Sequence, residues 1–465
     1  MYRLLTTAIA ALAISTSAAA MDRSDPRAVE ALSLYRDIVG LRSAAGHGKV
    51  PDVARRIAAD LKAAGFAETD ISIVAMGETA YLLARYAGKK GTKARPVAFL
   101  GHMDVVDARP EDWKFDPFAL REAGGDFLGR GSIDNKLGVA QLTRAFADLK
   151  RAGFVPDRDL YLAFSGDEET GMATTRALVD ALKPMNVDYA LNSDAGGGYL
   201  TPTGKAGAHG TQIAEKTFAT FDVTIRNEGG HSSRPRLDNA IYQLAELLRR
   251  VEAHRFPIEA NAATRANFRT LAASMPPAVA AMMRRFGDNP ADAEAGAALA
   301  ASPDTMHMIM TTCVATMLDA GHAENALPQR ATATINCRIF PGTEVGTVAA
   351  ALKSVGGNAD AEWAVRDAPR ASPVSEPRAD VIAAVNKALA IHYPGVTTTP
   401  YQESGGTDGK WFRIGGIPTY GVGAAFMEPA KIRAHGLDEN APVASFFNGL
   451  DYWPTLIREL TGKKR

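Results

Sequence analysis

Three consecutive carboxylates, Asp167, Glu168 and Glu169, directly follow the apolar run of residues 160–164. The run predicts a buried strand, and a helical pattern begins at Met172. Like charges packed where a core strand ends are costly unless a positive group lies between them. The stretch therefore predicts a strand–loop–helix unit whose loop is either a solvated acidic turn or part of a cation site.

Strand and helix patterns alternate through the first half of the chain. Helices are predicted over residues 25–41, 53–65, 137–150 and 172–182, and strands over residues 71–76, 81–86, 96–100, 160–164 and 189–191. Such alternation predicts an α/β fold, in which helices cover both faces of a mixed sheet.

From Glu215 onward the pattern changes to that of a small α+β unit. Strands are predicted over residues 216–226, 308–318, 330–340 and 361–365, and helices over residues 239–252 and 345–354. Because 465 residues are too many for one ordinary core, two domains are expected. We expect residues 213–370 to form a domain inserted between residues 21–212 and 371–465, with extra helices near residues 258–305. A core strand is expected over residues 417–423.

Residues 1–20 have the pattern of a secretory signal peptide. Arg3 precedes an apolar stretch, residues 4–14, which is too short to span a bilayer, and Ala18 to Ala20 form a small-residue cleavage site. We therefore expect a periplasmic or secreted protein. Lys plus Arg and Asp plus Glu both number 52, so neither nucleic acid nor a membrane surface is predicted as a partner.

Four further polar clusters lie at predicted strand ends or before helices of the outer domain. They contain His102 with Asp104, Asp134, Asp194 and His435. Each has a plainer reading alone, such as a helix cap for Asp134. Because the carboxyl ends of strands in open α/β sheets converge on one crevice, we expect the clusters to meet. Their imidazoles and carboxylates, with Glu168 and Glu169, suit two zinc ions, with cobalt or manganese as alternatives.

The order of these motifs resembles the M20 family of metallopeptidases, whose members include carboxypeptidases, dipeptidases and aminoacylases. The resemblance spans nearly the whole mature chain. It rests on GHMD at residues 101–104, WKFDPF at 113–118, GRGSIDNK at 129–136, GDEETG at 166–171, EGGHSSRP at 228–235 and HGLDEN at 435–440.

The resemblance implies a role for each clustered residue. His102 and Asp194 would hold one metal, Glu169 and His435 the other, and Asp134 would bridge both. Glu168 would act as the general base, and Asp104 would orient His102. The Asp134–Asn135 peptide bond is expected to be cis, as in relatives.

The same resemblance makes the inserted unit a lid. His231 would stabilise the developing oxyanion, often from the neighbouring subunit of a dimer. Asn325 and Arg338 would hold the carboxylate of the substrate, a task that suits the planar guanidinium of arginine. Gly406 and Thr407 would line the substrate pocket.

Cys313 and Cys337 lie on the two strands of a predicted hairpin, equally far from Asn325. That symmetry would allow a disulfide. We nevertheless expect two buried thiols on a packed face.

The sequence therefore predicts an exported two-metal hydrolase that cleaves a peptide or peptide-like amide beside a free carboxylate. An N-acyl amino acid amidohydrolase is the alternative enzyme, since it uses the same site. A non-catalytic binding protein with this fold would have no need of Glu168. The resemblance implies a homodimer through the lid, although the extra helices could block that contact.

Overall fold

The computed structural model of the chain describes residues 21–273 and 275–462. The expected signal peptide, residues 1–20, lies outside the described residues. Among the helices that the structure describes, none is both long and apolar enough to cross a membrane.

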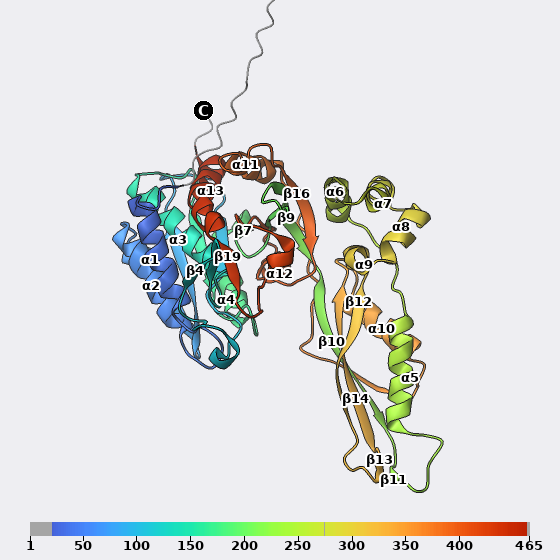
Figure 1. Ribbon diagram of the computed structural model, residues 1–465. Helices are drawn as coiled ribbons and strands as arrows, with labels where there is room; N and C mark the ends of the chain where they lie inside the picture. The colour runs from blue at the N-terminus through green and yellow to red at the C-terminus, as the bar shows by residue number, and fades with distance from the viewer. Residues whose placement is uncertain (1–20, 274, 463–465) are drawn as a thin grey trace, which may run out of the picture.

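The larger part of the molecule is built on a ten-stranded mixed sheet (Figure 1). Its spatial order is β1 (Ile71–Met76), β2 (Thr79–Tyr86), β6 (Leu160–Ser165), β3 (Val97–His102), β7 (Tyr189–Asn192), β17 (Thr419–Gly421), β9 (Ala206–Glu215), β8 (Gly197–Leu200) and β18 (Phe426–Met427), with β16 (Thr398–Glu403) beside β9. Strands β6, β3, β7 and β17 are parallel. Their carboxyl ends therefore lie along one edge.

Helices cover both faces of this sheet, which explains why every residue of β3, β6 and β7 is buried. One face packs on α1 (Pro26–Val39), α2 (Val50–Ala63), α3 (Lys136–Arg151), α11 (Ala379–Leu389) and α13 (Val443–Thr461). The other packs on α4 (Ala173–Leu182) and α12 (Gly409–Ile414). The predicted helix-covered mixed sheet is confirmed. The core strand expected over residues 417–423 is shorter, because only β17 is paired.

The remaining short elements of this part lie at its margins. A small sheet joins β4 (Arg121–Ala123), β5 (Asp126–Leu128) and β19 (Asn440–Pro442). Single turns of 3₁₀ helix occur at Glu68–Asp70, Pro110–Asp112, Lys183–Met185 and Pro429–Lys431.

A second sheet of four antiparallel strands extends away from the first (Figure 1). Its order is β12 (Thr312–Ala320), β14 (Arg330–Ile339), β10 (Thr217–Arg226) and β15 (Glu362–Val365). Helices α5 (Ala240–Ala253) and α10 (Val345–Gly356) pack against it around a separate apolar core. We call this unit the lid. Its far tip carries the short pair β11 (Gly230–His231) and β13 (Ala326–Leu327).

Four extra helices follow α5 and form a third apolar cluster. They are α6 (Ala262–Leu271), α7 (Pro277–Asp288), α8 (Ala293–Ala300) and α9 (Pro303–Ile309). Helix α6 packs on the large sheet, where the hydroxyls of Thr270 and Thr399 lie 2.9 Å apart. Asn261 Nδ2 donates to Gln402 Oε1 over 2.7 Å. These helices therefore link the lid to the larger part through contacts on β16.

The expectation of two buried thiols is wrong, because Cys313 and Cys337 form a disulfide. The antiparallel register of β12 and β14 places the two residues directly opposite each other, with Cα atoms 4.1 Å apart. The equal spacing about Asn325 was compatible with this pairing. Cys337 is buried in the lid core, and such burial is expected for a thiol and for a disulfide alike.

Candidate active site

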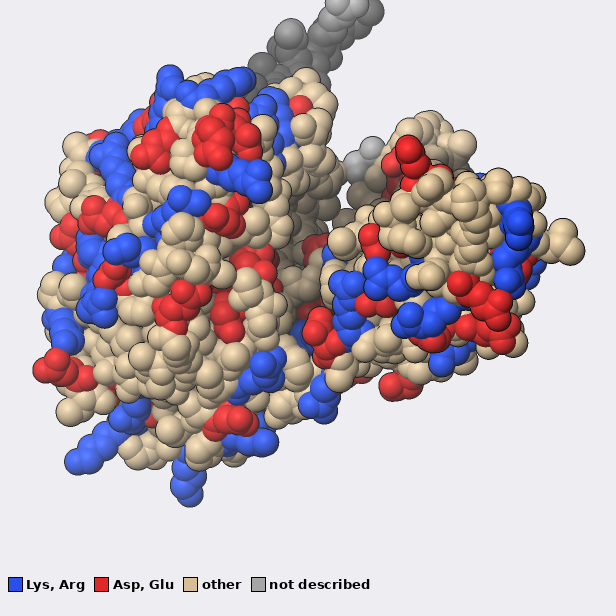
Figure 2. Space-filling view, turned by 90° about the horizontal axis from the view of Figure 1, so that it is seen from below, with Lys and Arg blue, Asp and Glu red and all other residues tan. Residues whose placement is uncertain are grey.

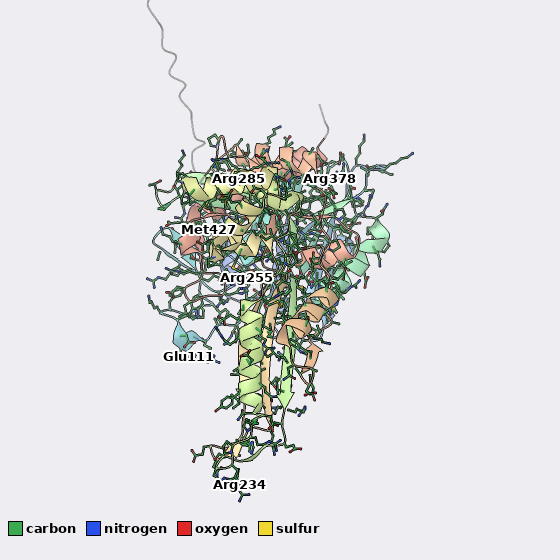
Figure 3. The ribbon with its side chains drawn as sticks, turned by 90° about the vertical axis from the view of Figure 1, so that its right-hand side faces the viewer. Glu111, Arg234, Arg255, Arg285, Arg378 and Met427 are labelled. Atoms are coloured by element: carbon green, nitrogen blue, oxygen red, sulfur yellow. A yellow bond between two sulfur atoms is a disulfide. The ribbon has the colours of Figure 1, made fainter. Side chains whose placement is uncertain are left out.

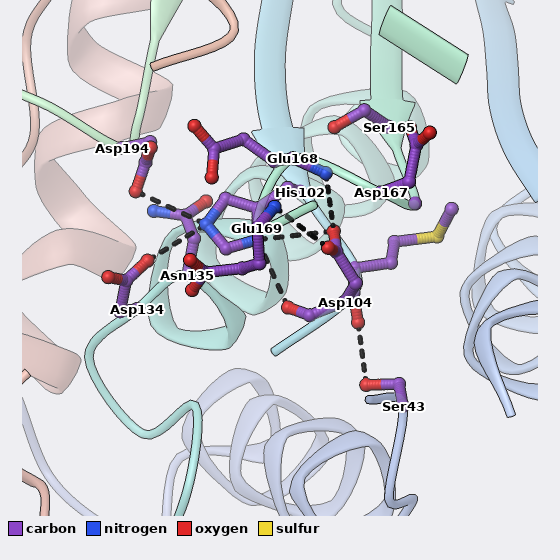
Figure 4. A network of polar contacts seen from close by, with 12 residues as sticks. Ser43, His102, Asp104, Asp134, Asn135, Ser165, Asp167, Glu168, Glu169 and Asp194 are labelled. Atoms are coloured by element: carbon purple, nitrogen blue, oxygen red, sulfur yellow. Dashed lines mark hydrogen bonds and ion pairs between the residues drawn. The ribbon is translucent and has the colours of Figure 1, made fainter. Parts of the chain in front are cut away.

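Three of the predicted ligand segments meet at the carboxyl edge of the parallel strands (Figure 4). His102 is the last residue of β3, Glu168 and Glu169 follow β6, and Asp194 follows β7. Because neighbouring parallel strands end on the same side, their following loops converge there.

Two further predicted ligands reach this edge from separate loops. Asp134 lies just before α3, and its peptide bond to Asn135 is cis, as predicted. His435 lies in the loop before β19 and has a φ of 63°, in the left-handed region that non-glycine residues seldom adopt. That conformation accompanies a side chain whose Nε2 lies 2.9 Å from Glu169 Oε1 and 3.0 Å from Asp134 Oδ2.

The five side chains form two groups that share Asp134. In one group, His102 Nε2 lies 2.8 Å from Asp134 Oδ1 and 3.4 Å from Asp194 Oδ1. The other group contains Asp134, Glu169 and His435. The ligand atoms of each group lie within 4.8 Å of one another. Since the two oxygens of Asp134 face different histidines, its carboxylate is placed to bridge two ions.

The electrostatics of these groups suit divalent cations. Burial raises the pKa of Asp194 to about 8, and hydrogen bonds with Asp134 and Glu169 raise that of His435 to about 10. Burial alone would lower the pKa of His102, but Asp194, with Asp104 and Asp134, holds it well above its usual range. The protein by itself therefore retains protons at this edge. Imidazole nitrogens and carboxylates would release those protons on binding zinc or a similar ion.

Asp104 organises the site without being one of the five predicted ligands. Its Oδ1 and Oδ2 accept from the backbone N–H groups of Glu168 and Glu169 over 3.1 and 3.0 Å. Its backbone oxygen lies 3.0 Å from His102 Nδ1. A metal-binding histidine is oriented by such a partner on its other ring nitrogen. Asp104 therefore positions residues from both β3 and the loop after β6.

The three consecutive carboxylates have different surroundings. Asp167 caps α4, accepting from the N–H groups of Ala173 and Thr174 over 2.7 and 2.9 Å. Glu169 faces His435. The carboxylate of Glu168 is buried, and burial raises its pKa well above the usual range. It forms no ion pair or hydrogen bond with any side chain of the described residues, and Figure 4 shows it pointing away from Asp104.

An ion pair that the sequence analysis did not identify holds Asp134 in place. Arg130 Nη1 donates to Glu439 Oε2 over 2.6 Å, and both side chains are buried. Glu439 Oε1 accepts from the backbone N–H groups of Ile133 and Asp134 over 3.0 and 3.2 Å. Both partners occur in the motifs GRGSIDNK and HGLDEN, so the motifs contained a signal for this pair.

A cavity of about 670 Å³ opens beside the ligands and is lined by Arg338, Gly406 and Thr407. The loop that carries Gly406 and Thr407 is fixed from below. Asp408 accepts from Ser165 Oγ at the end of β6 over 2.5 Å, and Thr407 Oγ1 donates to Glu215 over 2.9 Å. The structure thus brings these three predicted substrate-binding residues to the ligand cluster.

His231 and Asn325 are not brought to this cavity. His231 is exposed on β11 at the tip of the lid, where it pairs with Ala326. Ser232 N donates to the exposed Asn325 over 3.0 Å. Figure 3 shows the neighbouring Arg234 at the far end of the molecule. The lid sheet separates this tip from the ligands of the same chain.

Comparison with known proteins shows which family has this arrangement. The model of peptidase family M20/M25/M40 matches residues 98–459. N-fatty-acyl-amino acid synthase/hydrolase PM20D1 of Homo sapiens is 27% identical over 362 residues, which cover 76% of this chain and 71% of the relative.

Solved structures share the fold. The M20 family metallo-carboxypeptidase Sso-CP2 from Sulfolobus solfataricus superposes with a TM-score of 0.70 at 17% identity, covering 93% of this chain and 99% of that one. A dinuclear metal-binding peptidase of the M20 family from Bacillus subtilis superposes with a TM-score of 0.55 at 13% identity, covering 92% of this chain and 97% of that one.

Proposed function

Because the chain belongs to peptidase family M20/M25/M40, we propose that it is an exported two-metal hydrolase of peptides or peptide-like amides. The sharing of Asp134 between two histidine–carboxylate groups carries this proposal. His102 and Asp194 would hold one ion, Glu169 and His435 the other, and Asp134 both. When bound, divalent ions activate water and polarise the amide carbonyl.

The protein's own residues would move the proton. The carboxylate of Glu168 is buried next to the ligand groups. It forms no hydrogen bond or ion pair with a side chain of the described residues. A general base with a raised pKa can take a proton from water and then return it to the departing amine. Asp104 would keep Glu168 in place through the backbone N–H group that it accepts from.

We assign the substrate's carboxylate to Arg338. This side chain is half-buried at the boundary of the cavity, and its guanidinium lies 4.7 Å from the centre of the Phe218 ring. No carboxylate of the described residues forms an ion pair with it. An arginine held in this way is available for a bidentate pair with a carboxylate from the substrate. The substrate would then be cleaved next to a free carboxylate, as by a carboxypeptidase or dipeptidase.

An N-acyl amino acid amidohydrolase is the second candidate. The lining of the same cavity includes Ile133, Leu137, Met427 and Ile432, which would accept an apolar acyl group. The likeness to a fatty-acyl-amino acid synthase/hydrolase favours the same reading.

Export is supported by two observations on the chain itself. Residues 1–20 have the composition of a signal peptide, and the Cys313–Cys337 disulfide is typical of proteins in oxidising compartments. Identifying the first residue of the mature protein, purified from its native cell fraction, would test cleavage near Met21.

A substrate panel tests the enzymatic proposal. Dipeptides and N-acyl amino acids, each with a free or an amidated carboxylate, should be assayed on metal-loaded and chelator-treated protein. We expect hydrolysis to require the metal and to return with Zn²⁺. Amidation should lower kcat/KM by about tenfold or more, the value of a lost charged hydrogen bond. Arg338→Ala should remove that preference. Hydrolysis by metal-free protein would refute the mechanism, and equal cleavage of amidated substrates would refute the role of Arg338.

A further inference from the structure

A second cavity, of about 650 Å³, adjoins the candidate active site. Glu168, Glu169, Arg338 and Gly406 line both this cavity and the one described above. The two cavities therefore meet at the metal ligands and the proposed base. A molecule whose amide lies over the ligands could extend into both.

Five basic side chains line the second cavity, which we call the cationic cavity: Arg176, Lys216, Arg338, Arg370 and Lys410. They come from α4, the junction of β9 and β10, β14, the segment after β15, and α12. The carboxylates lining it are those of Glu168, Glu169 and Asp367. The two glutamates belong to the metal site, so Asp367, an exposed residue, is the one remaining acidic lining group.

None of the five cations forms an ion pair with a carboxylate of the described residues. Arg176, Lys216 and Arg338 donate hydrogen bonds to backbone oxygens instead. Arg176 Nη1 donates to Gly171 O over 2.9 Å, and Lys216 Nζ donates to Met310 O over 2.6 Å. Figure 2 shows basic and acidic side chains interspersed over one face of the molecule. The cationic cavity thus has five basic and three acidic lining residues, and none of the five cations is ion-paired within the described residues.

Burial makes the charge of Lys216 costly, whereas Arg338 and Lys410 are half-buried and Arg176 and Arg370 are exposed. Lys216 is only 1% exposed, and burial, with the nearby charge of Arg338, lowers its pKa to about 8. Burial also lowers the pKa of Lys410. A desolvated cation without a partner raises the free energy of the folded protein, and an anion bound beside it would lower that free energy.

The ring of Trp411 lies beside three of the five cations. The ring of Trp411 lies 5.0 Å from the guanidinium of Arg176, 5.9 Å from that of Arg370 and 5.5 Å from Lys410 Nζ. Such cation–π contacts orient a cation without neutralising its charge. Trp411 therefore gathers Arg176, Arg370 and Lys410 around one ring.

We propose that the cationic cavity binds a second anionic group of the substrate, such as the side-chain carboxylate of an acidic residue. This inference rests on the proposed function and narrows it to dianionic substrates. Arg338, at the boundary of the two cavities, holds the first carboxylate, and Arg176, Lys216, Arg370 and Lys410 attract the second. Continuity with the metal ligands assigns the anion to the substrate rather than to a separate regulator.

Matched substrate pairs test this preference on the metal-loaded enzyme. On the amine side, N-acetyl-glutamate is compared with N-acetyl-glutamine, and on the acyl side N-succinyl-alanine is compared with N-butyryl-alanine. We expect kcat/KM to favour the acidic member of at least one pair by about tenfold or more, from a charged hydrogen bond. Ratios near one in both pairs would overturn the proposal.

Lys410→Gln and Arg370→Gln identify the groups responsible. Each should reduce the ratio between acidic and neutral substrates severalfold, mainly through KM for the acidic member. Lys93→Gln is the matched control, because Lys93 is an exposed lysine that precedes β3, at the opposite end of the strand from His102. An unchanged ratio in both cavity variants, with intact metal content, would place the preference elsewhere and overturn the proposal.

Calorimetry separates this proposal from the enzymatic one. Glutarate should bind more tightly than its monoamide, glutaramate, and Lys410→Gln should reduce the difference severalfold whether or not any amide is hydrolysed. Glutarate should also compete with substrate. If hydrolysis fails but this difference remains, the enzymatic proposal alone fails. Equal binding of the two ligands, or glutarate binding that leaves substrate binding unaffected, would refute a dianionic substrate site.

Discussion

Glu168 and Glu169 are neighbours in the chain, but their carboxylates have different surroundings. Glu169 lies 2.9 Å from His435 Nε2, whereas the carboxylate of Glu168 contacts no described cation. Both backbone N–H groups donate to Asp104, which fixes the backbone from which the two side chains project. The different tasks that we propose for the pair therefore follow from side-chain direction.

Glutamine substitutions separate those tasks. Glu168→Gln should keep both metals and lower kcat by at least about 10²-fold, the usual contribution of a general base. Glu169→Gln should instead lower the metal content, because it removes a charged ligand. Metal analysis alongside single-turnover rates checks both. The reverse pattern would show that the two roles are assigned the wrong way round.

His209, buried away from the ligands, predicts a pH effect on stability. Its Nε2 lies 3.0 Å from Gly423 O and its Nδ1 2.8 Å from Thr398 Oγ1, a pattern that satisfies the neutral ring. Burial lowers its pKa from 6.5 to about 4. The unfolded chain therefore binds a proton that the folded one does not. The associated stability is present above pH 6.5 and is lost as the pH falls towards 4, by about 3 kcal/mol.

Urea unfolding of the wild type and His209→Gln between pH 7 and pH 4 measures this effect. The variant cannot titrate at this position, so its free energy of unfolding should fall less steeply with acid. Parallel losses in the two proteins would show that His209 does not contribute to acid sensitivity.

At the scale of elements, the pairing of β12 with β14 determines where the side chain of Arg338 lies. Successive residues of a strand face opposite sides, so the buried Cys337 directs the adjacent Arg338 toward the cavities. The disulfide to Cys313 joins this strand to the edge of the sheet. The covalent link therefore stabilises the strand that carries the proposed carboxylate-binding residue.

Replacing both cysteines by serine should destabilise the lid. A cross-link between positions 24 residues apart lowers the entropy of the unfolded chain. In the chain-entropy model this raises the free energy of unfolding by about 3 kcal/mol. Denaturant unfolding of the oxidised wild type and the double serine variant measures the difference. Reductant should bring the wild type close to the variant and leave the variant unchanged. Equal stability of the oxidised wild type and the variant would contradict this role.

At the scale of the molecule, the distance between the lid tip and the cavity bears on how many copies make one site. His231 lies on the exposed pair β11–β13, beyond the lid sheet from its own metal ligands. An oxyanion donor must touch the reacting group. If His231 has that role, either the lid moves or the tip of a second copy enters the cavity. We favour the second copy, because α6 packs on β16 and β9 and so links the inserted unit to the large sheet.

Mixing two inactive variants tests this arrangement. A dimer of His231→Ala with Glu168→Gln would contain one complete site, so random pairing should restore activity at about a quarter of the sites. Mixing His231→Ala with Asn325→Ala is the control, because both changes lie at the tip and no complete site can form. An inactive first mixture, together with a monomeric mass, would exclude a shared site.

Much of the fold and the ligand set could be predicted because the relevant signals are local. Apolar runs indicate strands, and polar residues placed where parallel strands end must meet at one edge. On that basis His102, Glu169 and Asp194 were expected to converge. The helix-covered mixed sheet with its inserted lid was predicted for the same reason.

Other properties depend on side-chain direction and on distances between remote segments, which spacing along the chain does not encode. Asp167 caps a helix although it is adjacent to Glu168, and the strand register joins Cys313 to Cys337. The cationic cavity gathers side chains from five separate segments, and no short motif contains them. The sequence determined which groups could bind metal, whereas tertiary packing decided which charges were left without a partner.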